Sequence, residues 1–76
     1  MSPKLPRITA FELLRALRRD GWLPIRQSGS HVTLKHALKK GRITVPNHSG
    51  TILKLKTLET ILKQAELTTD ELRELL

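Results

Sequence analysis

The sequence predicts an α+β domain with the element order α-β-β-β-α, in which two helices cover one face of a three-stranded antiparallel sheet. Three observations lead to this fold: apolar residues recur with a helical period before Gly21, with a period of two after it, and with a helical period again near the C-terminus. A chain of 76 residues is long enough for a single domain, residues 1–76, with a modest core. Cysteine is absent, so this core must be aliphatic.

The first helix is expected to begin near Ala10. Thr9 and Glu12 have the spacing of a capping box, in which each side chain accepts a hydrogen bond from a backbone N–H at the helix start. Gly21 is placed to end the helix in a left-handed conformation. The apolar stripe of this helix consists of Ala10, Leu13, Leu14 and Leu17.

Three strands are predicted at residues 22–27, 31–36 and 42–45, with turns at residues 28–30 and 37–41. Pro24 favours an edge position or an irregular start for the first strand, because proline has no N–H to give to a neighbouring strand. Alternation along the strands divides their side chains between two faces. Those expected to face the helices are Leu23, Ile25, Val32, Leu34, Ile43 and Val45.

The segment 46–56 has no sustained period and is predicted as a loop that carries His48 and Gly50. A second helix of about ten residues is expected to start near Thr57. Thr68 and Glu71 form another capping box, which predicts a short acidic helix at the C-terminus. The whole resembles double-stranded-RNA-binding domains in outline, and a shared fold by itself assigns no function.

Basic residues outnumber acidic ones, 14 against 7, which gives a net charge of +7. Residues 1–63 hold thirteen basic and three acidic residues, a net charge of +10, whereas residues 64–76 carry −3. This asymmetry favours a polyanionic partner, the alternative being a solvated basic surface without one. No apolar stretch approaches the roughly 18 residues that span a bilayer, and residues 1–7 hold no signal core. We therefore expect a cytoplasmic protein without membrane contact.

The polar face of the predicted sheet carries a histidine among cations and hydroxyls: Arg26, His31, Thr33, Lys35, Arg42 and Thr44. His31 follows the turn at Gly29 and Ser30, whose backbone N–H groups are expected to approach a phosphate. RNA cleavage needs a base and an acid, with cations stabilising the transition state, and histidine supplies such groups near neutral pH. On residues alone, an inert surface histidine remains the commoner interpretation.

Lys35 and Arg42 are the expected electrostatic helpers of His31, and His48 is the possible second catalytic histidine. Arg15 and Arg19 stand four apart on the first helix, where their mutual repulsion favours either an external anion or a solvated arginine face. His36 stands at the strand end in apolar parity and is expected to be a partly buried or turn residue rather than a catalyst. The residues expected to contact RNA are Gly29, Ser30, Lys35, Lys39, Lys40, Arg42, Arg15 and Arg19.

Zinc is a weak alternative, because the spacing of His31, His36 and His48 matches no known ligand pattern. RNA cleavage through the 2′-hydroxyl needs no metal in principle, so we expect neither a metal nor a cofactor. A non-catalytic RNA-binding module and a DNA-binding regulator remain competing functions. The basic face favours the first of these, and no recognition-helix pattern supports the second.

Six short segments occur in an order that is specific for a chain of this length: Lys4-Leu5-Pro6, Gly21-Trp22, Gln27-Ser28-Gly29-Ser30-His31, residues 44–50 (TVPNHSG), Leu53-Lys54, and residues 57–65 (TLETILKQA). Together they resemble the HicA (YcfA-like) family of mRNA interferase toxins. The resemblance implies a double-stranded-RNA-binding-like fold, ribosome-independent cleavage of mRNA, an essential histidine at His31, and a HicB-type antitoxin that covers this surface. Lys56 stands where the family usually has glycine, which leaves the start of the second helix open.

Overall fold

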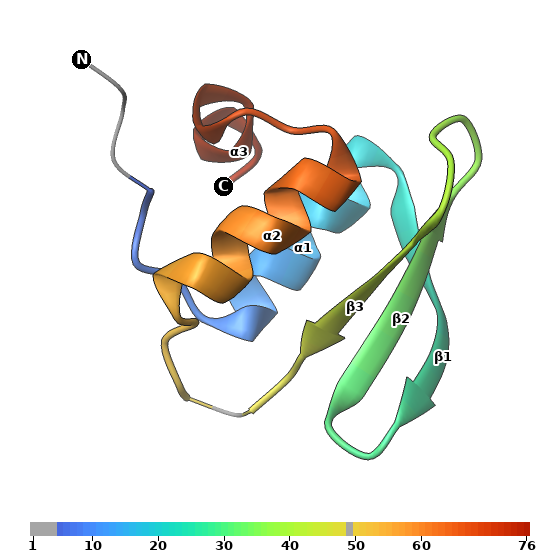
Figure 1. Cartoon of the computed structure of the whole chain (residues 1–76), viewed down its shortest axis with the longest axis horizontal. Helices are drawn as coiled ribbons and strands as arrows, with labels where there is room; N and C mark the ends of the chain where they lie inside the picture. Colours follow the sequence, from blue (N-terminus) through green and yellow to red (C-terminus); the bar gives the residue numbers. More distant parts are fainter. Residues whose placement is uncertain (1–4, 49) are drawn as a thin grey trace.

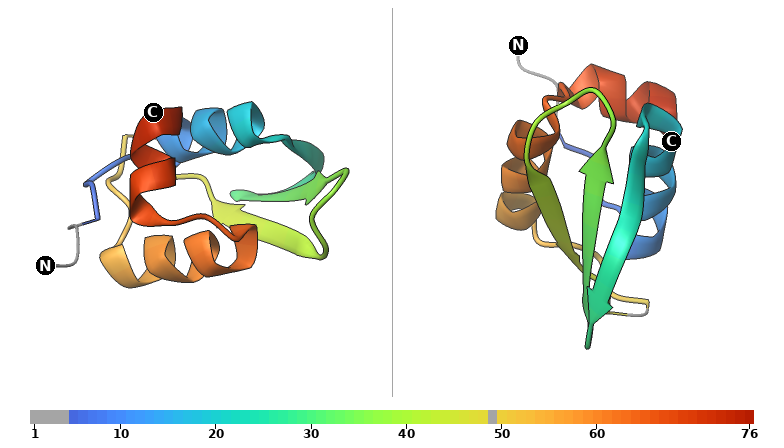
Figure 2. Two further views of the ribbon diagram at one scale, coloured as in Figure 1. Left: turned by 90° about the horizontal axis from the view of Figure 1, so that it is seen from above. Right: turned by 90° about the vertical axis from the view of Figure 1, so that its right-hand side faces the viewer.

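A computed structural model describes residues 5–48 and 50–76, so Lys4 and Ser49 of the family pattern lie outside the described residues. Three strands form an antiparallel sheet in the order β1-β2-β3, and the helices lie on one face of it (Figures 1 and 2). The predicted α+β class and order are confirmed. Within the described ranges, no helix is long and apolar enough to cross a membrane. The elements are α1 Ala10–Asp20, β1 Trp22–Ser28, β2 His31–His36, β3 Arg42–Pro46, α2 Leu55–Ala65 and α3 Thr69–Leu75.

Capping boxes open α1 and α3, as the sequence predicts. The Thr9 N–H donates to Glu12 Oε1 at 2.9 Å, and the Glu12 N–H donates to Thr9 Oγ1 at 3.2 Å. Thr68 and Glu71 repeat this exchange at 2.9 and 3.1 Å. Each box satisfies two backbone donors that the first turn of a helix leaves without an intrahelical partner.

The capping carboxylates make part of the stability depend on pH. Hydrogen bonds from the backbone and side chain of Thr9 lower the pKa of Glu12 below its ordinary value of 4.5, and those from Thr68 lower the pKa of Glu71 in the same way. A carboxylate whose pKa is lowered by folding stabilises the fold above pH 4.5, and this contribution is lost as the pH falls through the lowered value. We expect a Glu12→Gln/Glu71→Gln variant to lose less stability on acidification than the wild type.

Urea unfolding of the two proteins at about pH 6 and about pH 3 measures this difference. A difference between the two unfolding midpoints that is the same at both pH values would contradict the expectation.

The second helix, α2, starts at Leu55, two residues before the predicted start near Thr57. Leu55 and Lys56 are exposed, so these first two residues add nothing to the buried stripe by which the helix is detected in the sequence. The Leu58 N–H donates to the Lys54 carbonyl at 3.0 Å, which closes that first turn. The departure from the family pattern at Lys56 is therefore accommodated inside a regular helix.

The C-terminus of α2 holds a residue in an unfavourable conformation. Glu66 adopts φ 57° and ψ 43°, the left-handed region in which a side chain costs about 1–2 kcal/mol. Glu66 is exposed, and glycine is the residue that helix ends use most often at this place. We expect Glu66→Gly to raise the free energy of unfolding by about 0.5–1 kcal/mol, after subtraction of the entropy that glycine adds to the unfolded chain. Chemical denaturation measures this gain, and a loss of stability would contradict it.

The register of β1 differs from the predicted alternation. Trp22 pairs with His36 and Pro24 with Leu34, but a bulge between Pro24 and Arg26 inserts an extra residue into the strand. Trp22 is therefore fully buried on the helix side. The prediction that Leu23 and Ile25 face the helices is wrong, since they are 55% and 50% exposed. The other predicted inward side chains are buried, namely Val32, Leu34, Ile43 and Val45.

His36 joins α1 to the far end of the sheet, where its ring meets Trp22 edge to face at 5.2 Å between centroids. Its Nδ1 accepts hydrogen bonds from the N–H groups of Leu38 and Lys39, at 2.9 and 3.1 Å. Nε2 therefore carries the proton and donates to the Asp20 carbonyl at 2.6 Å. His36 is therefore buried, in line with the burial expected from its apolar parity.

Candidate functional site

The face of the sheet turned away from the helices carries the predicted polar residues. Residues that pair directly across antiparallel strands share a face, so the register groups them into rows. Starting at the β1–β2 turn, the rows are Ser28, His31 and Pro46; Arg26, Thr33 and Thr44; and Leu23, Lys35 and Arg42. The predicted polar face is confirmed by this pairing, with Leu23 as an apolar addition.

His31 is the exposed first residue of β2, at the end of the sheet marked by the β1–β2 turn. It lies opposite Pro46, which has no N–H, and the Asn47 N–H instead donates to the Ser30 carbonyl. This pattern makes His31 and Pro46 a non-hydrogen-bonded pair, whose Cα atoms are about 4.5 Å apart. The start of β2 is thus paired with β1 on one side and with β3 on the other, while the His31 imidazole remains open to solvent.

The turn before His31 contains only Gly29 and Ser30, because Ser28 already pairs with His31. Gly29 has φ 57°, the positive value that a type II′ hairpin turn requires at its first position. The Gln27 side chain donates through Nε2 to the Gly29 carbonyl at 3.3 Å. Gly29 is exposed and Ser30 is half-buried, so the turn forms an open rim beside the histidine.

His48 lies at the same end of the sheet as His31. His48 is exposed and comes two residues after Pro46, the residue that pairs with His31. Two residues of extended chain span at most about 7 Å, so His48 lies close to this pair. The His48 carbonyl accepts a hydrogen bond from the Thr51 N–H at 3.2 Å, which turns the loop back toward the helices. The position keeps His48 as the candidate for a second proton-transfer group.

Arg26 is the cation nearest to His31 on this face. It pairs with Thr33 and is therefore the diagonal neighbour of His31, at about 7–8 Å between Cα atoms. Lys35 lies four residues along β2, about 13 Å from His31, and Arg42 lies opposite Lys35. Sequence reasoning placed Arg26 on the correct face but did not include it among the RNA contacts. The distance between Arg26 and His31 follows only from the pairing of β1 with β2 after the bulge.

Lys39 and Lys40 lie in the β2–β3 turn, at the opposite end of β2 from His31. Lys39 Nζ donates to Asp20 Oδ2 and to the Ala65 carbonyl, each at 2.8 Å, and so connects the ends of α1 and α2. Lys40 is exposed. The structure therefore does not bring these two predicted RNA contacts to the histidine, and it gives Lys39 a role in packing.

The arginines of α1 are also separate from the outer face of the sheet. Arg19 Nη1 donates to the carbonyls of Leu75 and Leu76 at 2.7 and 3.1 Å, which ties α1 to the C-terminus. The Arg15 guanidinium lies 5.9 Å from the centroid of the Phe11 ring. Neither Arg15 nor Arg19, both predicted to contact RNA, therefore lies among the rows of side chains around His31.

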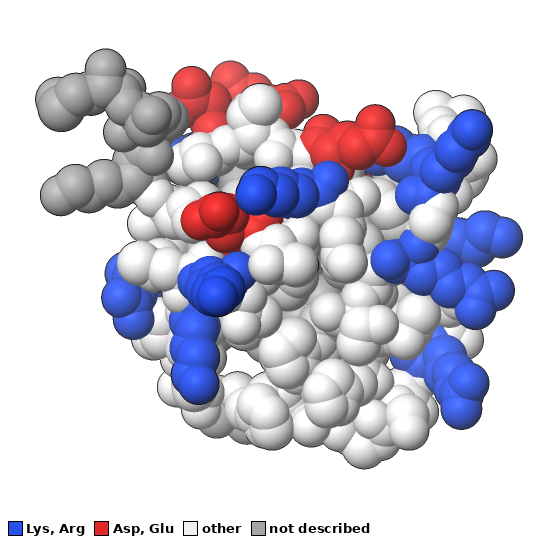
Figure 3. Space-filling view, viewed as in Figure 1, with Lys and Arg blue, Asp and Glu red and all other residues white. Residues whose placement is uncertain are grey.

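A hollow of about 440 Å³ lies beside the open edge of β3, and it brings two further lysines next to Arg42. Lys54 and Lys56 line it together with Thr44 and Thr57. Sequence reasoning missed these lysines, since only the path of the loop before α2 returns them to the sheet. Figure 3 shows Lys and Arg side chains on both flanks of one face of the molecule, whereas most of the acidic side chains visible on this face lie along its top.

Comparison with known proteins identifies the family of this chain. The model of a family described as the HicA toxin of bacterial toxin–antitoxin systems matches residues 11–67 of the 76 residues. A search of curated proteins found no match. The matched range includes the turn at Gly29 and Ser30, His31 and the loop with His48. The chain belongs to the HicA toxin family of bacterial toxin–antitoxin systems.

Proposed function

We propose that this toxin is an endoribonuclease that cleaves mRNA, with His31 as its main catalytic residue. The observation that carries the proposal is the placement of His31, exposed at the end of the sheet with Arg26 as its diagonal neighbour. An exposed imidazole close to a guanidinium can move a proton next to a charge that develops on a phosphate.

The proposed reaction uses the 2′-hydroxyl of the RNA. A base takes the proton of this hydroxyl, the oxygen attacks phosphorus, and an acid gives a proton to the departing 5′ oxygen. The products are a 2′,3′-cyclic phosphate and a 5′-hydroxyl, so atoms and charges balance without a further reactant. His31 supplies one proton transfer, and His48 is the candidate for the other because it lies at the same end of the sheet.

The cations have different roles in this proposal because they lie at different distances from His31. Arg26 is close enough to stabilise the phosphate under attack. Lys35 and Arg42 lie further along the strands and bind phosphates on one side of the cleavage site. Lys54 and Lys56 extend this basic track past the edge of β3. The exposed turn at Gly29 and Ser30 offers backbone N–H groups at the other end.

A HicB-type antitoxin is the proposed protein partner, and its binding would cover the outer face of the sheet. Leu23 and Ile25 are about half-exposed on the edge strand β1, next to the basic rows. Apolar side chains among cations suit a protein surface with acidic groups around an apolar centre. Growth arrest on expression of the toxin, relieved by a co-expressed neighbouring antitoxin gene, would support this pairing.

An RNA cleavage assay tests the proposed activity. The purified protein is incubated with an unstructured RNA in the presence of EDTA, and with the same RNA carrying a single 2′-deoxynucleotide at the cleavage site. We expect cleavage of the first RNA, a 2′,3′-cyclic phosphate on its product, and no cleavage at the substituted position. Cleavage of the substituted RNA would contradict the mechanism.

The competing function is binding of RNA without cleavage, which the same basic face would support. In that case RNA stays intact over hours and its affinity falls with salt, with a log–log slope of about −0.7 for each single-strand phosphate contact. A gel of the RNA after incubation separates the two functions.

A further inference from the structure

A groove between α1 and the helix-facing side of β1 is not used by the proposed reaction. It has a volume of about 440 Å³, within the range of small-molecule sites. The groove exists because β1 presents Pro24 and Gln27 on this side, where neither fills the space next to the helix. Residues from four segments line it, among them Phe11, Leu14, Arg18, Gln27, Val32 and Asn47.

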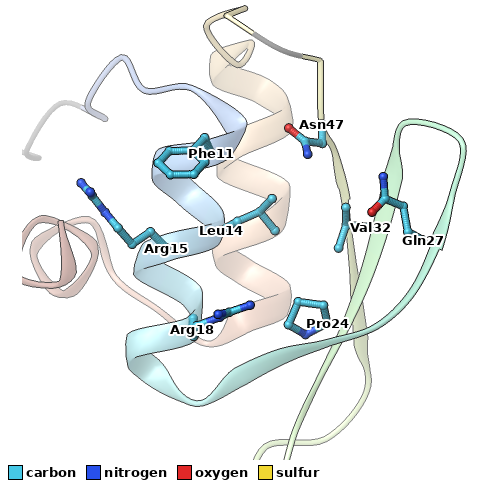
Figure 4. Close-up of a pocket in the computed structure, with 8 residues that line it drawn as sticks. All are labelled: Phe11, Leu14, Arg15, Arg18, Pro24, Gln27, Val32 and Asn47. Carbon is cyan, nitrogen blue, oxygen red and sulfur yellow. The ribbon is translucent and has the colours of Figure 1, made fainter.

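The lining combines an apolar interior with polar groups at its ends. Leu14 projects from α1 toward the sheet, while Arg18 and Asn47 point into the space from its two ends (Figure 4). Phe11 is 70% exposed, and the Arg15 guanidinium lies near its ring on the side away from the sheet. The exposed Phe11 ring thus lies at the rim of the groove, where a planar ligand can reach it.

These groups match the chemistry of one RNA nucleotide. Single-stranded RNA is bound by stacking of its bases on aromatic rings, and by hydrogen bonds to the base edges. The side-chain amides of Gln27 and Asn47 can both donate and accept such bonds. Arg18 supplies a positive charge for a phosphate, and none of the lining residues is acidic.

The groove also lies close to the candidate catalytic end of the sheet. Its residue Val32 directly follows His31, and the Asn47 N–H donates to the carbonyl of Ser30. His31 lies on the opposite face of the sheet, but β1 is an edge strand, so only one strand and the Gly29 turn separate the two sites. An RNA strand that crosses this edge can contact both.

We propose that the groove binds the base of a nucleotide next to the cleavage site and thereby sets the sequence preference of the toxin. The inference rests on the proposed RNA-cleaving function for its substrate, but binding alone tests it. An antitoxin segment is the competing occupant. RNA is favoured because two amides, a stacking face and an arginine converge in one groove beside the turn that precedes His31.

The test uses the full chain carrying His31→Ala and a short 2′-O-methyl RNA of mixed sequence, which cannot be cleaved through a 2′-hydroxyl. Chemical-shift changes in the backbone amides are followed by NMR during titration. We expect shifts at Phe11, Arg18, Gln27 and Asn47 in addition to those on the outer face of the sheet. Shifts confined to the outer face would overturn the inference.

A variant pair gives the second measurement. Phe11→Ala should weaken binding by about 5- to 150-fold, the range that corresponds to loss of one stacked base. Leu38→Ala is the matched control, because Leu38 is 89% exposed at the other end of the sheet. Equal affinities of the two variants would overturn the inference.

Sequence preference is measured in wild-type background with Gln27→Ala and Asn47→Ala, by comparing cleavage of RNAs that differ at one flanking base. We expect these variants to lose discrimination between the RNAs. If the wild type cleaves no RNA but the NMR shifts map to the groove, the proposed function fails and the binding site stands. Groove shifts that arise only with the antitoxin would overturn the inference.

Discussion

His31→Ala should lower the rate of RNA cleavage by about 10²- to 10⁴-fold, the contribution typical of a positioned histidine in proton transfer. The fold should be unaffected, since His31 is exposed and its pairing with Ser28 and Pro46 uses backbone and position, not the imidazole. We expect the free energy of unfolding to change by less than about 0.5 kcal/mol. Single-turnover cleavage and chemical denaturation of the same preparation measure both quantities.

Two further variants, His48→Ala and Thr51→Ala, show whether a second histidine takes part in cleavage. His48→Ala should reduce cleavage as well if His48 provides the second proton transfer, and should leave it unchanged if a different group does. Thr51→Ala is a control in the same exposed loop, because its N–H bond to the His48 carbonyl does not involve its side chain. A folded His31→Ala protein that still cleaves at the wild-type rate would contradict the assignment.

The helix ends and the central strand were predictable because local chemistry determines them. The capping boxes at Thr9 and Thr68 and the left-handed Gly21 are short-range features, and the structure has all three. The range of β2 was predicted without error, since its alternation of apolar and polar residues is regular. The start of α2 at Leu55 could not be predicted, because the exposed side chains of Leu55 and Lys56 do not join the buried stripe.

The bulge in β1 could not be predicted from the period of the sequence. Leu23 and Ile25 alternate as inward side chains would, and Pro24 indicates an edge or an irregular start without placing the extra residue between Pro24 and Arg26. The core selects Trp22 for the inward position because it buries more apolar surface than Leu23. This choice leaves two aliphatic side chains exposed on the edge strand.

The sequence predicts which face of the sheet carries the candidate site, but not the distances between its residues. Alternation alone assigned His31, Lys35 and Arg42 to one face, and the register confirms that assignment. The position of Arg26 next to His31 depends on pairing between strands, and the position of Lys54 depends on a loop without a period. Lys39 and Arg19 were assigned to RNA from their charge, whereas their contacts are with the carboxylate and carbonyl groups of this chain.

Gly21→Ala should be the most destabilising of the substitutions considered for this chain. Gly21 ends α1 with φ 109°, a conformation that costs a residue with a side chain about 1–2 kcal/mol. A Cβ atom at this position would also lie 2.6 Å from His36 Nε2. The ring cannot move away freely, because the Asp20 carbonyl and two backbone N–H groups hold both of its nitrogens.

These two effects add to a loss of about 2–4 kcal/mol, which is a large part of the 4–11 kcal/mol or so expected for a domain of this size. The midpoint of thermal unfolding should therefore be at least about 10 °C lower than in the wild type. Glu66→Gly is the matched substitution in the opposite direction at the end of α2, where φ is also positive and the residue is exposed. If Gly21→Ala cost no more than the left-handed conformation alone, the contact with His36 would not be rigid. Gly21→Ala in a His36→Ala background separates the two contributions, because only the backbone cost then remains.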